Sequence, residues 1–114
     1  MSTITHDDVG NDLRRILISG RLDTPGTNSI ASQLVELAAA KKAVVVDLSH
    51  VQFLASIGIG TLISTAKVVA GRGGRMALVV DKSLPVMMSL QAIGLDKLIP
   101  ICLNLPDAER AALT

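Results

Sequence analysis

The sequence predicts an α/β fold, in which a mixed sheet of four to five strands packs against four to five helices. Short apolar runs rich in valine and isoleucine alternate with longer segments whose apolar residues recur every three or four positions. Hydrophobic residues make up 49% of the 114 residues, which excludes a disordered chain and supports one domain over residues 1–114. Because strands and helices alternate from Leu13 onward, we expect the sheet to be mixed or largely parallel.

Five segments are expected to form strands, because each is a short run of residues that favour strands between turn residues. The β-branched run at 44–48 is expected at the centre of the sheet, and the polar run at the N-terminus only as an edge strand. The expected strands are Ser2–His6, Leu13–Ser19, Val44–Leu48, Met76–Val80 and Leu98–Leu103.

Four segments show helical periodicity or helix-start residues. The first is expected to follow a loop over Arg21–Gly26, with Thr27 or Asn28 as its N-cap. The second begins near Ser56, whose hydroxyl stands where it could cap free backbone amides. The expected helices cover residues 27–40, 56–70, 83–92 and 106–113.

The composition argues against several classes of partner and compartment. A net charge of +1 with scattered basic residues gives no basis for direct binding to nucleic acid or to an anionic membrane. Phe53 is the only aromatic residue, so no stacking platform for bases is expected. Cys102 is a lone cysteine, expected as a small buried hydrophobe, and the polar N-terminus carries no signal peptide. These features predict a cytoplasmic protein.

Catalytic and cofactor motifs are incomplete. Gly58-Ile59-Gly60 would need a third glycine where Ile63 stands to form a dinucleotide-binding turn. A nucleophile elbow at Ser56 would need a histidine later in the chain, and both histidines precede it. Two histidines and one cysteine, far apart, make no metal cluster. We therefore expect no catalytic residue, no cofactor and no metal.

Ser56 is the residue that invites a functional interpretation. It is either a helix cap or a modification site, and a phosphate there would meet the positive end of the helix. Small neighbours are expected to leave the start of this helix open to another protein, and apolar neighbours to form a rim beside it. The small residues are Ala55, Gly58 and Gly60, and the apolar ones are Leu54, Ile57 and Ile59.

From about Ile16 to Ile101, the chain resembles the STAS domains, specifically the bacterial anti-sigma factor antagonists of the partner-switching type. Five runs carry the resemblance. Ile18–Asp23 looks like the strand end "G-x-(L/I)-D" of the family, and Val45–Leu54 looks like its central run "hydrophobic-D-L-x-x-V-x-F-(M/L)". Gly58–Gly60 matches the family's "G-L-G". Gly73-Gly74 matches the glycines before the next strand, and Gly94-Leu95 matches the late "G-L".

The resemblance implies a phosphorylation site. The family signature "D-S-(S/T)-G" places its phosphorylated serine on Ser56, although Ala55 replaces the aspartate and Ile57 the second hydroxyl residue. It also implies a non-enzymatic protein that, unphosphorylated, binds a serine-kinase anti-sigma factor and is reset by a PP2C-type phosphatase. The expected contact residues are Asp23, Thr24, Leu54, Ala55, Ile57, Gly58, Ile59 and Gly60. The alternative is a STAS module for ligand sensing or structural interaction, in which Ser56 is only a cap. Ala55 and Ile57, which depart from the family signature, favour that alternative.

Overall fold

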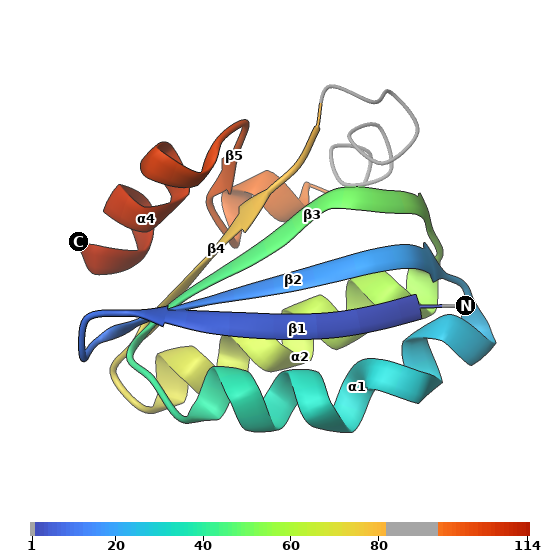
Figure 1. The fold of residues 1–114 in the computed structure, drawn as a ribbon, viewed down its shortest axis with the longest axis horizontal. Helices are drawn as coiled ribbons and strands as arrows, with labels where there is room; N and C mark the ends of the chain where they lie inside the picture. The colour runs from blue at the N-terminus through green and yellow to red at the C-terminus, as the bar shows by residue number, and fades with distance from the viewer. Residues whose placement is uncertain (1, 82–93) are drawn as a thin grey trace.

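Five strands form one mixed sheet whose spatial order follows the chain, β1-β2-β3-β4-β5 (Figure 1). The computed structural model describes residues 2–81 and 94–114. The strands are β1 Ser2–Val9, β2 Leu13–Leu22, β3 Ala43–Leu54, β4 Arg75–Val79 and β5 Ile101–Cys102. β1 pairs antiparallel with β2, and the other neighbouring strands are parallel. The predicted mixed α/β fold is confirmed.

Helices cover both faces of this sheet (Figure 1). In the described residues there are three α-helices and one 3₁₀ turn, fewer than the four to five helices expected. They are α1 Thr24–Ala39, α2 Ser56–Gly71, η1 Leu95–Lys97 and α4 Leu105–Leu113. The helix expected over residues 83–92 lies outside the described residues. Within the described ranges, no helix combines the length and hydropathy needed to cross a bilayer.

The alternation of side chains along the strands builds two cores. Val44 and Val46 pack into the larger core, beneath α1 and α2, whereas Ala43 and Val45 pack into a smaller core beneath α4. Successive side chains of a strand point to opposite faces, so the central strands must be apolar at nearly every position. This explains why the run of three valines predicted a central strand.

β3 continues six residues beyond its predicted end at Leu48. The pairing with β2 shifts by one residue twice, between Leu17 and Ser19 and between Gly20 and Arg21 of β2. Each shift inserts an extra residue into β3, as in a β-bulge, and interrupts the period of two that identifies a strand in sequence. The Asp47 carboxylate supports the first irregularity, because it accepts a hydrogen bond from the Ser49 amide at 2.9 Å.

α1 begins at Thr24, so the predicted loop to residue 26 and the predicted cap at residue 27 or 28 are wrong. Asp23 is the N-cap, and its Oδ1 accepts a hydrogen bond from the Gly26 amide at 2.9 Å. Pro25 lies in the first turn, where a backbone N–H is not required. Only glycine can occupy position 26, because a Cβ there would lie 1.9 Å from the Arg21 carbonyl oxygen. The Pro-Gly pair therefore starts a helix here and does not form a turn.

The C-terminal part also departs from the prediction. The strand expected over Leu98–Leu103 is only two residues long, because η1 precedes it and leaves Leu98 71% exposed. Cys102 is half-buried against the smaller core, and this burial raises the pKa of its thiol. α4 starts at Leu105, one residue before the predicted start, with Asn104 as its N-cap.

Candidate functional site

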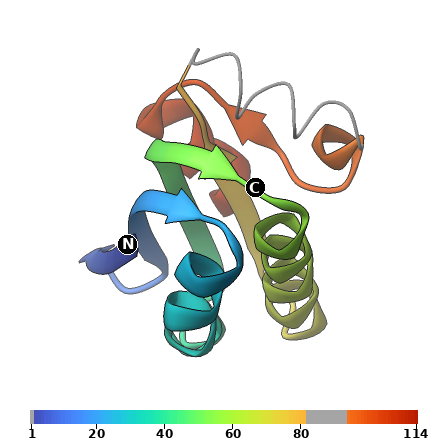
Figure 2. The same cartoon turned by 90° about the vertical axis from the view of Figure 1, so that its right-hand side faces the viewer.

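The candidate site lies where β2 and β3 end and α1 and α2 begin, at the edge that faces the viewer in Figure 2. β2 and β3 are parallel neighbours, and each is followed by a helix, so both helices start at the same edge of the sheet. The Ala55 amide donates a hydrogen bond to the Leu22 carbonyl oxygen at 3.0 Å, which ties the two connections together. The topology thus brings Asp23 and Thr24 to the side of the sheet where Ser56 lies.

Ser56 is the first residue of α2 and is exposed. The N-cap is Ala55, in an extended conformation, and α2 has no side-chain cap hydrogen bond. The interpretation of Ser56 as the N-cap is therefore wrong. None of the hydrogen bonds among the described residues uses the Ser56 hydroxyl, so this group is not committed to holding the helix.

Three of the expected contact residues are buried, and their role is to attach α2 to the sheet. Leu54 and Ile59 are only 5% and 8% exposed, and both belong to the larger core. Gly58 is also buried, and a Cβ there would lie 2.8 Å from Leu54 Cδ1 and 3.1 Å from Leu22 Cβ. Gly58 thus permits close packing of α2 and does not leave the helix start open, contrary to the expectation.

The remaining expected residues reach the surface. Thr24, Ile57 and Gly60 are exposed, and Asp23 and Ala55 are half-buried. A Cβ added at Gly60 would meet nothing within 4 Å, so the expectation of open space holds there. Of the three apolar neighbours of Ser56 that were expected to form a rim, Ile57 is the exposed one, at 37%.

Arg21 and Phe53 also lie at this edge of the sheet, and the sequence did not predict them as site residues. The Arg21 guanidinium lies 4.5 Å from the centre of the Phe53 ring, and its Nε lies 3.7 Å from Asp23 Oδ2. The ring is 40% exposed although it is the chain's only aromatic group. The sequence feature that could have indicated a contact residue is that Phe53 is the only aromatic residue, because a lone aromatic at a strand end can bind a partner as well as fill the core. We call the set formed by Arg21, Asp23, Thr24, Phe53, Ser56, Ile57 and Gly60 the Ser56 surface.

The electrostatics of this edge favour an anion at the start of α2. Helix N-termini carry unpaired amides and a partial positive charge. At α1 the Asp23 carboxylate occupies this position, whereas at α2 Ala55 offers no acceptor. A negative group attached to Ser56 would therefore meet an uncapped helix start.

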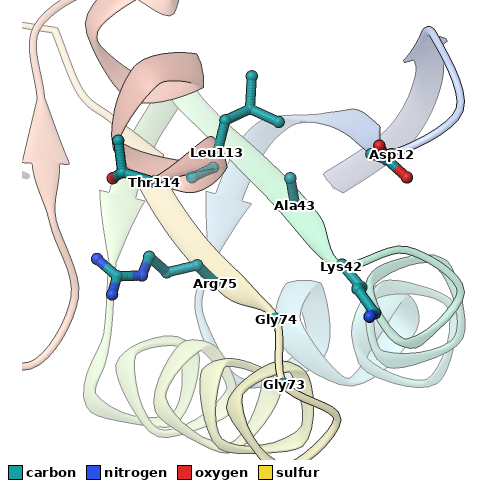
Figure 3. A pocket seen from close by; sticks show the side chains of 9 residues that line it. Asp12, Lys42, Ala43, Gly73, Gly74, Arg75, Leu113 and Thr114 are labelled. Carbon is teal, nitrogen blue, oxygen red and sulfur yellow. The ribbon is translucent and has the colours of Figure 1, made fainter.

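A cavity of about 580 Å³ lies elsewhere, near the beginnings of β3 and β4 (Figure 3). Its charged side chains, Asp12, Lys42 and Arg75, point in different directions and do not converge on one point (Figure 3). Parallel strands begin at this end and finish at the Ser56 end, so the cavity and the Ser56 surface are on opposite edges of the sheet. Within the described residues, no group of three histidine, cysteine or acidic side chains could hold a metal ion.

Comparison with known proteins identifies relatives of this chain. A family model described as the STAS domain matches residues 5–108. The anti-sigma F factor antagonist of Paenibacillus polymyxa is 32% identical over 88 residues, which are 75% of this chain and 74% of that protein.

Solved structures share the fold. An anti-sigma factor antagonist from Mycobacterium paratuberculosis superposes with a TM-score of 0.89 at 25% identity, covering 100% of this chain and 96% of that chain. The Bacillus protein SpoIIAA in its phosphorylated form superposes with a TM-score of 0.69 at 17% identity, covering 95% of this chain and 98% of that chain. Since the family model spans most of the chain and the sequence relative passes 30% identity, the chain belongs to the STAS domain family.

Proposed function

We propose that this chain is an anti-sigma factor antagonist, which binds a serine-kinase anti-sigma factor through the Ser56 surface and thereby releases the kinase's client. The observation that carries the proposal is an exposed serine with an uncommitted hydroxyl at the start of α2, close in the chain to two exposed apolar residues, Phe53 and Ile57. An aromatic anchor near an aliphatic side chain, with polar groups around them, is the usual anatomy of a binding surface. Membership of the STAS family and the name of the Paenibacillus polymyxa relative support the same function.

Phosphorylation of Ser56 would switch this binding off. The kinase transfers the γ-phosphoryl group of ATP to the Ser56 oxygen, ADP leaves, and the hydroxyl proton is lost. The product carries nearly two additional negative charges. The uncapped start of α2 favours these charges locally, so the fold is retained. The partner must then cover a charged group at the start of α2, which costs desolvation and weakens the complex.

Hydrolysis of the phosphoserine by a PP2C-type phosphatase would restore the binding state. This cycle would take place in the cytoplasm, without direct contact between the chain and nucleic acid or membrane. The alternative of a ligand-sensing or structural STAS module makes Ser56 a helix cap. Against this, the N-cap residue of α2 is Ala55, and the Ser56 hydroxyl makes no cap hydrogen bond.

A charge placed on Ser56 tests the proposal. Ser56→Asp should weaken binding to the serine-kinase anti-sigma factor about tenfold to a few hundredfold, as expected for a charge covered by a partner. Ser64→Asp is the matched control, because Ser64 is exposed on the same helix but outside the Ser56 surface. Titration calorimetry should give wild-type affinity for Ser64→Asp and for Ser56→Ala, which keeps the unmodified charge.

Phosphopeptide mapping after incubation with the kinase and ATP completes the test. One phosphate on Ser56 is expected, together with loss of binding by the phosphorylated chain. Equal affinity of wild type and Ser56→Asp, or a phosphate on another residue with Ser56 unmodified, would contradict the switch.

A further inference from the structure

A second hydrophobic surface lies along the later half of α2. Two adjoining hollows, of about 160 and 200 Å³, separate this helix from the segment 98–100. They share four lining residues and therefore form one groove, which we call the α2 groove. The shared residues are Ala66, Ala70, Leu98 and Ile99.

The α2 groove is separate from the Ser56 surface. Ala66 is ten residues beyond Ser56 on α2, which is about 15 Å along the helix axis at 1.5 Å per residue. None of the residues of the Ser56 surface lines either hollow. Binding in the groove would therefore be independent of the state of Ser56.

The shape of the groove suits side chains of another protein. Ala66 and Ala70 are small, so a partner can approach α2 closely between them and the larger wall residues. Leu98 forms part of the wall and is 71% exposed, the largest exposed fraction among the large hydrophobic residues described. Two apolar hollows side by side match apolar residues spaced three or four positions apart on a partner helix.

The two charged residues that line the α2 groove are both basic. Residues 56–76 and 94–100 contain four basic residues, Lys67, Arg72, Arg75 and Lys97, and one acidic residue, Asp96. Lys67 lines one hollow and Arg75 the other. None of the ion pairs among the described residues involves any of these four cations. Unpaired cations at the rim of an apolar groove select a partner whose flanking charges are negative.

We propose that the α2 groove binds an acidic amphipathic helix of another protein. The partner's apolar side chains enter the two hollows, and its glutamate or aspartate residues face Lys67 and Arg75. The recognition combines apolar burial with charge complementarity, so it should weaken as salt concentration rises.

The test uses two synthetic fluorescent peptides, each about four helical turns long so that a helix can form on binding. Both carry leucines at positions i, i+3 and i+7; one has glutamates and the other lysines on the flanks. Fluorescence anisotropy with the full chain at low salt should show the glutamate peptide binding at least about tenfold more tightly than the lysine peptide. The double variant Lys67→Glu with Arg75→Glu should reverse that order.

A substitution in the wall separates groove binding from general charge attraction. Leu98→Asn should reduce binding of the glutamate peptide by about tenfold, the effect of losing an exposed apolar anchor. Leu103→Asn is the matched control, because Leu103 is 51% exposed but lines neither hollow, and it should leave binding unchanged.

Three results of the peptide experiments would overturn the proposal. They are equal binding of the two peptides, no binding of either, and equal effects of Leu98→Asn and Leu103→Asn. A concentration-dependent dimer of the wild type that Leu98→Asn abolishes, measured by light scattering, would assign the groove to a second copy and would also overturn it.

Discussion

The Arg21 guanidinium lies 4.5 Å from the centre of the Phe53 ring, across strands in which these two residues are register partners. The same guanidinium approaches Asp23, which caps α1. One arginine thus connects the end of β2, the end of β3 and the start of α1. This contact restrains the exposed ring, so a partner that binds Phe53 meets a side chain already held in place, which reduces the entropy cost of binding.

Phe53→Ala should therefore affect binding more than stability. An exposed cation–π contact contributes about 1 kcal/mol or less, so the free energy of unfolding in urea should fall only by about that amount. A central aromatic anchor, by contrast, is typically worth about 2 kcal/mol or more in a complex. Titration calorimetry against the serine-kinase anti-sigma factor should show that larger loss.

Val68→Ala is the control for this prediction. Val68 is 38% exposed on α2, close to the 40% of Phe53, but lies outside the Ser56 surface. Its substitution should leave the dissociation constant at the wild-type value. If both variants bound as tightly as wild type, Phe53 would be an exposed residue without a role in binding.

The sequence predicted the strands that follow a simple alternation and missed the features that depend on irregular geometry. The valines of β3 and the apolar run of β4 are buried on both faces, so composition alone locates them. The end of β3 could not be predicted, because two shifts of register break the period of two after Asp47. The start of α1 was missed because Pro25 and Gly26 are typical of turns, and only the Arg21 carbonyl above Gly26 requires a glycine there.

The site was predicted in part for similar reasons. A motif places Ser56 and Asp23 in the chain, and parallel neighbouring strands then place them at one edge of the sheet. Burial is a property of the packed structure, so Leu54 and Ile59 could not be separated from Ile57 beforehand. The Arg21–Phe53 contact depends on the register after the second shift in β3, which no local pattern encodes.

Replacement of two glycines of α2 by alanine should change the stability of the fold in opposite directions. Gly58→Ala introduces a Cβ 2.8 Å from Leu54 Cδ1 and 3.1 Å from Leu22 Cβ, and this overpacking should destabilise the fold by about 1–3 kcal/mol. Gly60→Ala meets nothing within 4 Å and lies at a negative φ, so it should stabilise the fold by about 0.4–1 kcal/mol. Urea denaturation of both variants measures the difference. A stabilising Gly58→Ala would show that α2 can move away from Leu22 without cost.

The unfolding free energy at acidic pH should depend on Asp8. Arg14 donates two hydrogen bonds to its carboxylate, at 2.7 and 3.1 Å, and this contact lowers the pKa of Asp8. A carboxyl whose pKa is lower in the folded state stabilises the fold above its unfolded pKa, and that contribution is lost as the pH falls through the folded value. Wild type and Asp8→Asn should therefore differ in unfolding free energy at neutral pH. The difference should begin to shrink below about pH 4, near the unfolded pKa, and vanish below the lower folded pKa.

Asp12→Asn is the control for removing one carboxylate at neutral pH, because Asp12 forms no ion pair among the described residues. Unfolding followed by circular dichroism at several pH values makes the comparison. Parallel curves for wild type and Asp8→Asn would mean that the Asp8–Arg14 pair contributes nothing to folding.

The N-cap of α2 offers a separate test of what the residue at position 55 does. Ala55 has the extended conformation of an N-cap, with φ −86° and ψ 169°, but no side-chain acceptor. Ala55→Asp and Ala55→Asn both supply an oxygen that can accept a hydrogen bond from the first turn, and each should stabilise the fold by about 1 kcal/mol. Thermal unfolding of the two variants should show similar increases in Tm.

Phosphorylation separates the two variants. If an aspartate beside Ser56 helps to present the hydroxyl to the kinase, Ala55→Asp should be phosphorylated faster than wild type, while Ala55→Asn, with the same cap and no charge, should not. The rate of phosphate incorporation from ATP measures this effect. Equal acceleration in both variants would attribute it to a better-ordered helix start, because the cap is the property that they share. Equal rates in all three proteins would show that the residue before Ser56 stabilises α2 without influencing the kinase.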